Sequence, residues 1–204
     1  MLDGNLRTAV DRALIPIGRG LQRIGVTADV VTIIGIAMSG AAAIAIGRGS
    51  LLLGFILLIL TGIPDALDGA VAKAAGTSSK RGAFFDSVSD RLTDALLFGG
   101  IAWHYASTQP GHLMMLPVAV MASAQIISYQ RAKAELLGYE AKGGVMERAE
   151  RFIVLALGLL LSVLIGEDAL LVVLWIMLAL TLITAIQRFI KVWLQATAEQ
   201  KEAL

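Results

Sequence analysis

The chain has 204 residues, of which 57% are hydrophobic and none is cysteine, and its formal net charge is +1. Its mean hydropathy is +0.77. A soluble domain has roughly 45–50% apolar residues even when glycine is counted, so the composition indicates a membrane protein. The lack of cysteine excludes disulfides, thiolate zinc sites and Fe–S clusters. The small net charge excludes the global basic field of a typical nucleic-acid-binding protein, so we expect no nucleic-acid partner.

The N-terminal segment, residues 1–25, alternates between apolar and charged positions. It contains no continuous apolar run of the kind found in signal peptides. This pattern predicts an amphipathic helix that lies on the membrane surface. Its arginines would face lipid phosphates; they are Arg7, Arg12, Arg19 and Arg23. An ordinary solvated helix is the alternative interpretation.

Six stretches of the sequence are candidates for membrane spans, since a helix needs roughly 20 mostly apolar residues to cross a bilayer. They are residues 29–47, 51–73, 83–107, 113–137, 149–166 and 168–192. Turn-forming residues, glycine above all, lie between them. The sequence therefore predicts an all-α membrane protein. Its six transmembrane helices would follow the N-terminal surface helix and form a single domain over residues 1–204.

The distribution of lysine and arginine predicts the orientation of these spans. An even number of spans places both termini on one side, and 16 of the 17 basic residues fall on that side or near its helix ends. Only Arg48 falls on the other side. Because an excess of cations marks the cytoplasmic side, we expect both termini in the cytoplasm and the chain in the cell inner (plasma) membrane.

Four aspartates lie near the cytoplasmic ends of the second and third predicted spans. Asp65 and Asp68 are three residues apart, and Asp86 and Asp90 are four apart; each pair therefore lies on one helical face. The connection between the spans is short, so the helices would be antiparallel neighbours and the pairs would meet. Carboxylates so close together need countercharge. Oxygen ligands alone favour Mg²⁺, Mn²⁺ or Ca²⁺, and two such ions would suit phosphoryl chemistry.

The acids alone leave other functions open. Acidic residues within membrane spans also form proton relays and ion pathways in transporters, so a divalent-cation transporter is an alternative to a metal-dependent enzyme. Single acids at helix ends can also be plain interfacial residues. A cluster of carboxylates on two consecutive spans, framed by glycines, fits that last interpretation poorly.

The spacing of the acids resembles a family signature. Residues 65–90 read D-A-L-D-G-A-V-A-K, eight residues, then G-A-F-F-D-S-V-S-D. This is similar to the motif of the CDP-alcohol phosphotransferase family, D-x-x-D-G-x-x-A-R, eight residues, then G-x-x-x-D-x-x-x-D, with Lys73 in place of the arginine. The resemblance implies that the four aspartates bind two Mg²⁺ or Mn²⁺ ions and that Asp90 is also the catalytic base. An alcohol would attack the β-phosphorus of a CDP-linked lipid, and CMP would leave.

The resemblance also implies a binding site for the CDP-lipid, because residues 27–32 (T-A-D-V-V-T) are similar to the start of the first span in this family. The expected contacts are Asp29, Val30, Val31, Thr32, Gly69, Ala72, Lys73 and Ser79. Thr27 or Asp29 could also be a helix N-cap, a role compatible with binding the ligand. Gly69 and Ala72 could also serve close helix packing. Lys73 would present a single point charge to a phosphate, whereas the arginine of the family motif would present a planar guanidinium fork.

Three basic residues outside the motif bear on the acceptor alcohol. Arg131, Arg151 and Arg188 lie near the cytoplasmic ends of three different spans. Together they could bind an anionic acceptor, although membrane anchoring by positive residues is an alternative for each. The sequences around them resemble the actinobacterial phosphatidylinositol phosphate synthases within the family, in which basic residues at these positions are implicated in binding inositol phosphate. This resemblance implies transfer of the phosphatidyl group from CDP-diacylglycerol to 1D-myo-inositol 3-phosphate.

Two related activities stay open at this point. Phosphatidylglycerophosphate synthase and archaetidylinositol phosphate synthase also use an anionic acceptor, so the basic residues do not separate them from the first interpretation. Serine or choline as acceptor fits the basic residues poorly. Members of the family are often homodimers, so the resemblance implies a homodimer in contact with membrane lipid.

Overall fold

The computed structural model of the chain describes residues 16–17, 20–75, 79–109 and 111–202, and for residues 65–66, 68–70 and 72–75 it describes the backbone alone. Most of the predicted surface helix over residues 1–25 lies outside this part. Its described end, residues 20–23, is helical. The helix ends at Gly25, whose φ of +83° lies in the left-handed region that favours glycine.

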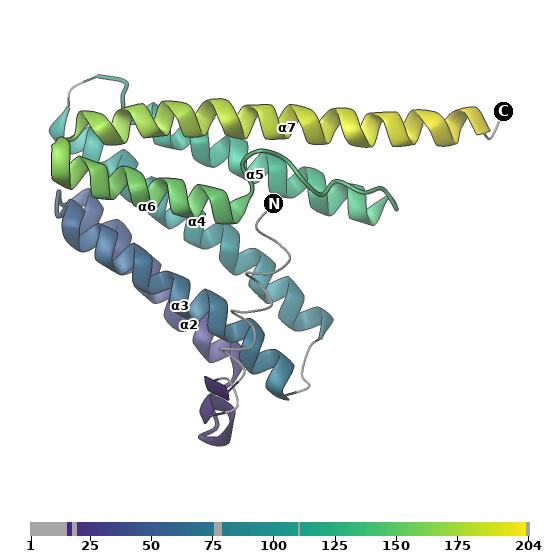
Figure 1. Cartoon of the computed structure of the whole chain (residues 1–204), viewed down its shortest axis with the longest axis horizontal. Helices are drawn as coiled ribbons and strands as arrows, with labels where there is room; N and C mark the ends of the chain where they lie inside the picture. Colours follow the sequence, from purple (N-terminus) through teal and green to yellow (C-terminus); the bar gives the residue numbers. More distant parts are fainter. Residues whose placement is uncertain (1–15, 18–19, 76–78, 110, 203–204) are drawn as a thin grey trace. The chain divides into compact units, whose positions relative to one another are not determined.

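Six helices with complete bounds make up the described part of the chain, and no strand is found there (Figure 1). They are α2 (Ala28–Gly47), α3 (Leu51–Ala75), α4 (Lys80–Thr108), α5 (Met115–Leu136), α6 (Arg148–Ile165) and α7 (Asp168–Glu202). The all-α prediction is confirmed, and each predicted span coincides with one helix. α7 continues beyond the predicted end at residue 192, because the residues that follow include good helix formers such as alanine, glutamine and glutamate.

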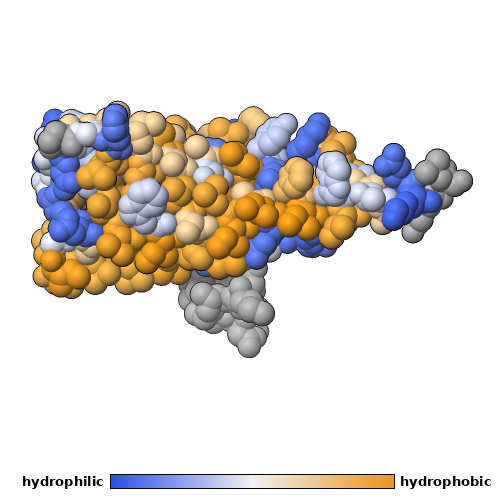
Figure 2. Space-filling view, turned by 90° about the horizontal axis from the view of Figure 1, so that it is seen from above, coloured by the Kyte–Doolittle hydropathy of each residue, from blue (hydrophilic) through white to orange (hydrophobic). Residues whose placement is uncertain are grey.

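Two helices are long and apolar enough to cross a membrane, as judged over the described residues. They are α2 and the part of α7 from Asp168 to Lys201. The apolar part of α3, Leu51–Pro64, is shorter. α4 and α6 carry charged residues in their first turns, which lowers their apolar content. Large apolar side chains are exposed along α7, and Figure 2 shows hydrophobic residues over much of one face and hydrophilic ones toward the C-terminal end of α7.

The chain divides into two compact units. Unit 1 contains α2 to Ala45, α3 from Leu53 and α4 to Leu97, and unit 2 contains residues 46–52 and the chain from Phe98 onward. In unit 1 the absence of a side chain at Gly35 of α2 allows close approach to α3. A Cβ built on Gly35 would lie 3.2 Å from the Cβ of Pro64.

In unit 2, α7 packs along both α5 and α6. Gly158 of α6 makes this packing tight, because a Cβ built there would lie 2.9 Å from Val173 and 3.1 Å from Leu170. α6 ends at Ile165 and is capped by Gly166, whose φ is +113° and whose N–H donates to Ser162 O at 3.2 Å. Asp168 lies in the first turn of α7, where a negative charge stabilises the helix dipole. The predicted turn between the fifth and sixth spans is therefore confirmed.

Candidate active site

Two of the four predicted aspartates lie on the first half of α4. Asp86 and Asp90 are one turn apart on the same helical face. The side chain of Asp86 is exposed and that of Asp90 is half-buried. Arg91 lies beside them: its Nη1 donates to Ser87 O at 2.7 Å and lies 3.3 Å from the Oδ2 of Asp90. The cation partly offsets the repulsion between the two carboxylates.

The other two aspartates, Asp65 and Asp68, belong to the last turns of α3, whose backbone is described there without these side chains. α3 ends and α4 begins at the same end of unit 1, joined by residues 76–79 (Figure 1). Among the side chains that the structure describes, no group of three or more aspartate, glutamate or histidine residues is close enough to bind a metal. Two of the four predicted ligands, Asp65 and Asp68, are not among these side chains.

The described acids nevertheless suit a hard divalent cation. Asp86 and Asp90 offer only carboxylate oxygens, which are the ligands that Mg²⁺ and Mn²⁺ prefer. Their position in the first turns of α4 puts them next to the connection from α3. The two described carboxylates therefore fit a metal site that needs further oxygen ligands.

Pro64 precedes the acids of α3, and the sequence pattern did not single it out. α3 continues through this proline, although its missing N–H removes one backbone hydrogen bond. The ring of Pro64 lies against Gly35. This contact brings α2 and α3 together one residue before Asp65. A proline inside an apolar stretch, with a glycine in the neighbouring span, is the signal that could have predicted this contact.

The start of α2 contains the predicted CDP-lipid contacts of the first span. Thr27 is the N-cap, since its Oγ1 accepts the N–H of Val30 at 3.4 Å, so the cap interpretation is confirmed for this residue. Thr32 donates from its hydroxyl to Ala28 O at 3.1 Å. The side chain of Val30 is exposed, whereas that of Val31 is only 5% exposed and belongs to the core.

Asp29, in the first turn of α2, forms an ion pair with Arg81 in the first turn of α4. Ser79 is the N-cap of α4, because its Oγ accepts the N–H of Gly82 at 3.1 Å. Both side chains therefore contact the first turn of α4, the helix that carries Asp86. The remaining predicted contacts belong to the part of α3 described by its backbone alone: Gly69, Ala72 and Lys73.

The structure brings the three predicted acceptor residues together in unit 2. We call Arg131 of α5, Arg151 of α6 and Arg188 of α7 the basic cluster. The charges of Arg131 and Arg151 are both close enough to act on Arg188. Arg131 is exposed and pairs with Glu135 at 2.9 Å, whereas Arg151 and Arg188 are each only 4% exposed.

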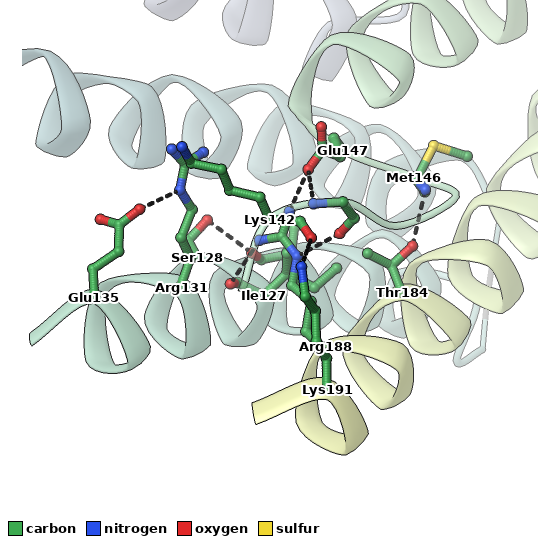
Figure 3. A network of polar contacts seen from close by, with 12 residues as sticks. Ile127, Ser128, Arg131, Glu135, Lys142, Met146, Glu147, Thr184, Arg188 and Lys191 are labelled. Atoms are coloured by element: carbon green, nitrogen blue, oxygen red, sulfur yellow. Dashed lines mark hydrogen bonds and ion pairs between the residues drawn. The ribbon is translucent and has the colours of Figure 1, made fainter. Parts of the chain in front are cut away.

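Arg188 is held by three hydrogen bonds (Figure 3). Its Nε donates to Gly143 O at 2.9 Å, its Nη1 donates to Ile127 O at 3.2 Å, and its Nη2 donates to the Oε1 of Glu147 at 2.6 Å. The same Glu147 oxygen accepts the N–H of Gly143 at 3.1 Å. The sequence pattern did not predict a role for Glu147. Its local signal is an acidic residue directly before α6, in a segment that contains the adjacent glycines Gly143 and Gly144.

The loop over residues 137–147 lies along one face of α7. The α7 residues that bind it are three or four positions apart and form a ladder, which consists of Thr184, Arg188, Lys191, Gln195 and Glu199. Gln195 bonds both the N–H and the carbonyl of Glu140, at 2.9 and 2.8 Å. At the far end the hydroxyl of Tyr139 donates to Glu199 at 2.5 Å, and this hydrogen bond raises the pKa of Tyr139.

The acids of α4 in unit 1 suit a divalent metal ion, and the arginines of the basic cluster in unit 2 suit phosphate. The described part of the chain is therefore an all-α protein whose two units each carry side chains suited to phosphate chemistry. Comparison with known families is more specific. Residues 25–187 match the sequence model of the CDP-alcohol phosphatidyltransferase family, and the chain belongs to that family. Its members are membrane-embedded transferases that depend on divalent cations. The resemblance seen in the aspartate motif is confirmed.

Several similar proteins come from actinobacteria. The phosphatidylinositol phosphate synthase of Mycobacterium marinum is 36% identical over 192 residues, which cover 92% of this chain and 82% of that protein. The enzyme of the same name from Mycobacterium bovis is 34% identical over 203 residues, which cover 97% of this chain and 94% of that protein.

Solved structures of the phosphatidylinositol phosphate synthase of Mycobacterium tuberculosis are also similar. The structure with CDP-DAG bound superposes with a TM-score of 0.83 at 34% identity and covers 89% of this chain and 94% of that chain. The complex with manganese and citrate gives a TM-score of 0.82 at 34% identity and covers 88% of each chain.

Proposed function

We propose that the chain is a phosphatidylinositol phosphate synthase, which transfers the phosphatidyl group of CDP-diacylglycerol to 1D-myo-inositol 3-phosphate and releases CMP. The observation that carries the proposal is the 34–36% identity to enzymes of that name over 92–97% of the chain. The basic cluster supports an anionic acceptor, since arginine is well suited to phosphate.

Asp65, Asp68, Asp86 and Asp90 are proposed to hold two divalent ions, Mg²⁺ or Mn²⁺. The oxygen-only donor set of α4 supports this assignment, and a relative has been solved with manganese. Bound divalent ions would neutralise charge on the pyrophosphate and on the CMP that leaves. Four carboxylates match two ions better than one.

Asp90 is proposed as the general base. Its carboxylate would take the proton of the acceptor hydroxyl while the hydroxyl oxygen forms a bond to the β-phosphorus of the CDP-lipid. The bond from that phosphorus to the bridging oxygen of CMP breaks, and CMP keeps the electron pair. The position of Asp90 one turn from Asp86 on the same face of α4 supports this role, because a general base must lie beside the groups that hold the substrate.

The CDP-lipid is proposed to contact the start of α2, the end of α3 and the start of α4. The residues are Asp29, Val30, Val31, Thr32, Gly69, Ala72, Lys73 and Ser79. Two contacts within unit 1 support this assignment: the Asp29–Arg81 ion pair and the Ser79 cap both hold polar groups at the beginning of α4. The acceptor phosphate is proposed to bind Arg131, Arg151 and Arg188.

The chain is proposed to be one domain over residues 1–204, in which an N-terminal surface helix is followed by six transmembrane helices. α3, α4, α5 and α6 have 25, 29, 22 and 18 residues. At about 1.5 Å per residue these helices are comparable in length to the roughly 30 Å hydrocarbon core. We further propose a homodimer in the inner (plasma) membrane whose active site faces the cytoplasm, as the distribution of cations supports.

The test is a comparison of acceptors with the purified full chain. CMP release from CDP-diacylglycerol is measured in the presence of Mg²⁺ with inositol 3-phosphate, inositol and glycerol 3-phosphate. We expect inositol 3-phosphate to give the highest kcat/KM. A preference for glycerol 3-phosphate would identify a phosphatidylglycerophosphate synthase instead. Metal flux across liposomes without any CMP release would identify a cation transporter.

A further inference from the structure

Arg188 is a buried cation with one charged partner among its three hydrogen-bond acceptors. Two of the acceptors, Ile127 O and Gly143 O, are neutral carbonyls, and the third is the carboxylate of Glu147. The bond to Glu147 is the shortest of the three, at 2.6 Å. A buried guanidinium without an anion is strongly unfavourable, so Glu147 offsets much of the cost of placing Arg188 there.

The three acceptors also fix the plane of the guanidinium. They come from α5, from the loop and from the residue directly before α6, and each binds a different nitrogen (Figure 3). An arginine has five N–H donors. Within the described residues the three hydrogen bonds of Arg188 use three of them, which leaves one donor on Nη1 and one on Nη2. The three acceptors together set the direction of these two donors, and Glu147 is the charged one among them.

Glu147 is itself held in place. Its Oε1 accepts the N–H of Gly143, so the carboxylate bridges the loop and α7. Its backbone carbonyl accepts the N–H of Arg151 at 3.0 Å in the first turn of α6. One residue therefore connects two members of the basic cluster, through its side chain to Arg188 and through its backbone to the helix that carries Arg151.

We propose that Glu147 is a positioning residue for the acceptor. It orients Arg188 so that the two remaining N–H groups bind the phosphate of the acceptor, and it does not contact the acceptor itself. The inference deepens the proposed function and rests on it, because it requires a phosphorylated acceptor. If Glu147 had a purely structural role, its substitution would alter the stability of the folded protein. It would not raise the KM of one substrate more than that of the other.

The test compares Glu147→Gln with Glu140→Gln in the full chain. Glu140 belongs to the same loop, but its side chain is 64% exposed and lies 3.7 Å from the ammonium group of Lys191. CMP release is measured while each substrate is varied in turn. We expect Glu147→Gln to raise the KM for inositol 3-phosphate about tenfold or more, since a charge-assisted bond is lost. The KM for CDP-diacylglycerol should change by less than about twofold, and Glu140→Gln should change neither.

A double-mutant cycle checks that the effect passes through Arg188. In an Arg188→Ala background, Glu147→Gln should raise the acceptor KM by less than about twofold, because the residue that it orients is absent. An equal rise in the KM of both substrates, an unchanged acceptor KM, or a full additional effect in the Arg188→Ala background would each overturn the proposal.

Two further measurements keep the outcome decisive. If Glu147→Gln does not purify as a folded protein, Glu147→Asp is measured instead, because it keeps the charge and shortens the side chain. An acceptor KM within about twofold of the wild type would then overturn the proposal.

The wild type is measured first. If it uses glycerol 3-phosphate and not inositol 3-phosphate, the acceptor of the proposed function is wrong, and the variants are compared with glycerol 3-phosphate instead.

Discussion

We expect Gly144→Ala to destabilise unit 2, because the loop has no room for a side chain where it crosses α7. Gly144 has a φ of +139°, and a Cβ built there would overlap the Cγ2 of Thr184 and lie 3.2 Å from its Cβ. Thr184 cannot withdraw freely. Its hydroxyl oxygen accepts the buried N–H of Met146 at 2.9 Å, and the hydroxyl donates to Leu180 O at 2.9 Å.

Gly143→Ala is the matched control for the magnitude. Gly143 has a φ of +94°, and no described atom lies within 4 Å of a Cβ built on it. Both substitutions place an L-residue in the left-handed region, which costs about 1–2 kcal/mol. Only Gly144→Ala also disturbs Thr184, and a buried Met146 N–H without its partner costs about 1–3 kcal/mol. That difference corresponds to roughly 2–12 °C in unfolding temperature for a chain of this size.

The assay is thermal unfolding of the two purified variants in the same detergent, followed by far-UV circular dichroism. The double variant Gly144→Ala/Thr184→Ser removes the methyl group that the new Cβ would overlap and keeps the hydroxyl. It should regain part of the difference between the single variants. Equal unfolding temperatures for Gly143→Ala and Gly144→Ala would refute the reasoning.

Three other predictions concern the chemistry and the packing. Asp90→Asn should lower kcat for CMP release by about 10²–10⁴-fold, and a kcat within about tenfold of the wild type would show that Asp90 is not the base. Chelation with EDTA should abolish CMP release and added Mg²⁺ or Mn²⁺ should restore it, so activity that survives chelation would contradict a metal-dependent reaction. Gly47→Ala should lower the unfolding temperature, because its Cβ would overlap the ring of Trp103. Gly99→Ala, which meets no described atom within 4 Å, should leave that temperature unchanged or raise it, and equal effects of the two substitutions would argue against the Trp103 contact.

Local patterns were enough to predict the helices and the N-cap of α2. Apolar stretches separated by glycine-rich turns predicted the positions of all six helices from α2 to α7. Thr27 was recognised as a possible N-cap because its side chain binds a backbone group only three residues away. The spacing within the aspartate motif predicted which acids share a face of α4. These features depend on residues within one or two helical turns.

The contacts that hold the candidate site together depend on distant residues, which no local pattern specifies. Arg188 and Glu147 are 41 residues apart, and in the sequence each looks like an ordinary charge near a helix end. Gly35 and Pro64 meet only because α2 and α3 pack against each other. The family resemblance predicted that Arg188 binds the acceptor phosphate, whereas its hydrogen bond to Glu147 is found only in the structure, where the loop lies along α7.

The lipid product of the purified chain is the most direct test of the proposed function. CDP-diacylglycerol, inositol 3-phosphate and glycerol 3-phosphate are supplied together with Mg²⁺, and the lipids formed are identified by mass spectrometry. We predict phosphatidylinositol phosphate, formed in an amount equal to the CMP released. Phosphatidylglycerol phosphate as the main product, or no new lipid while CDP-diacylglycerol remains intact, would contradict the assignment.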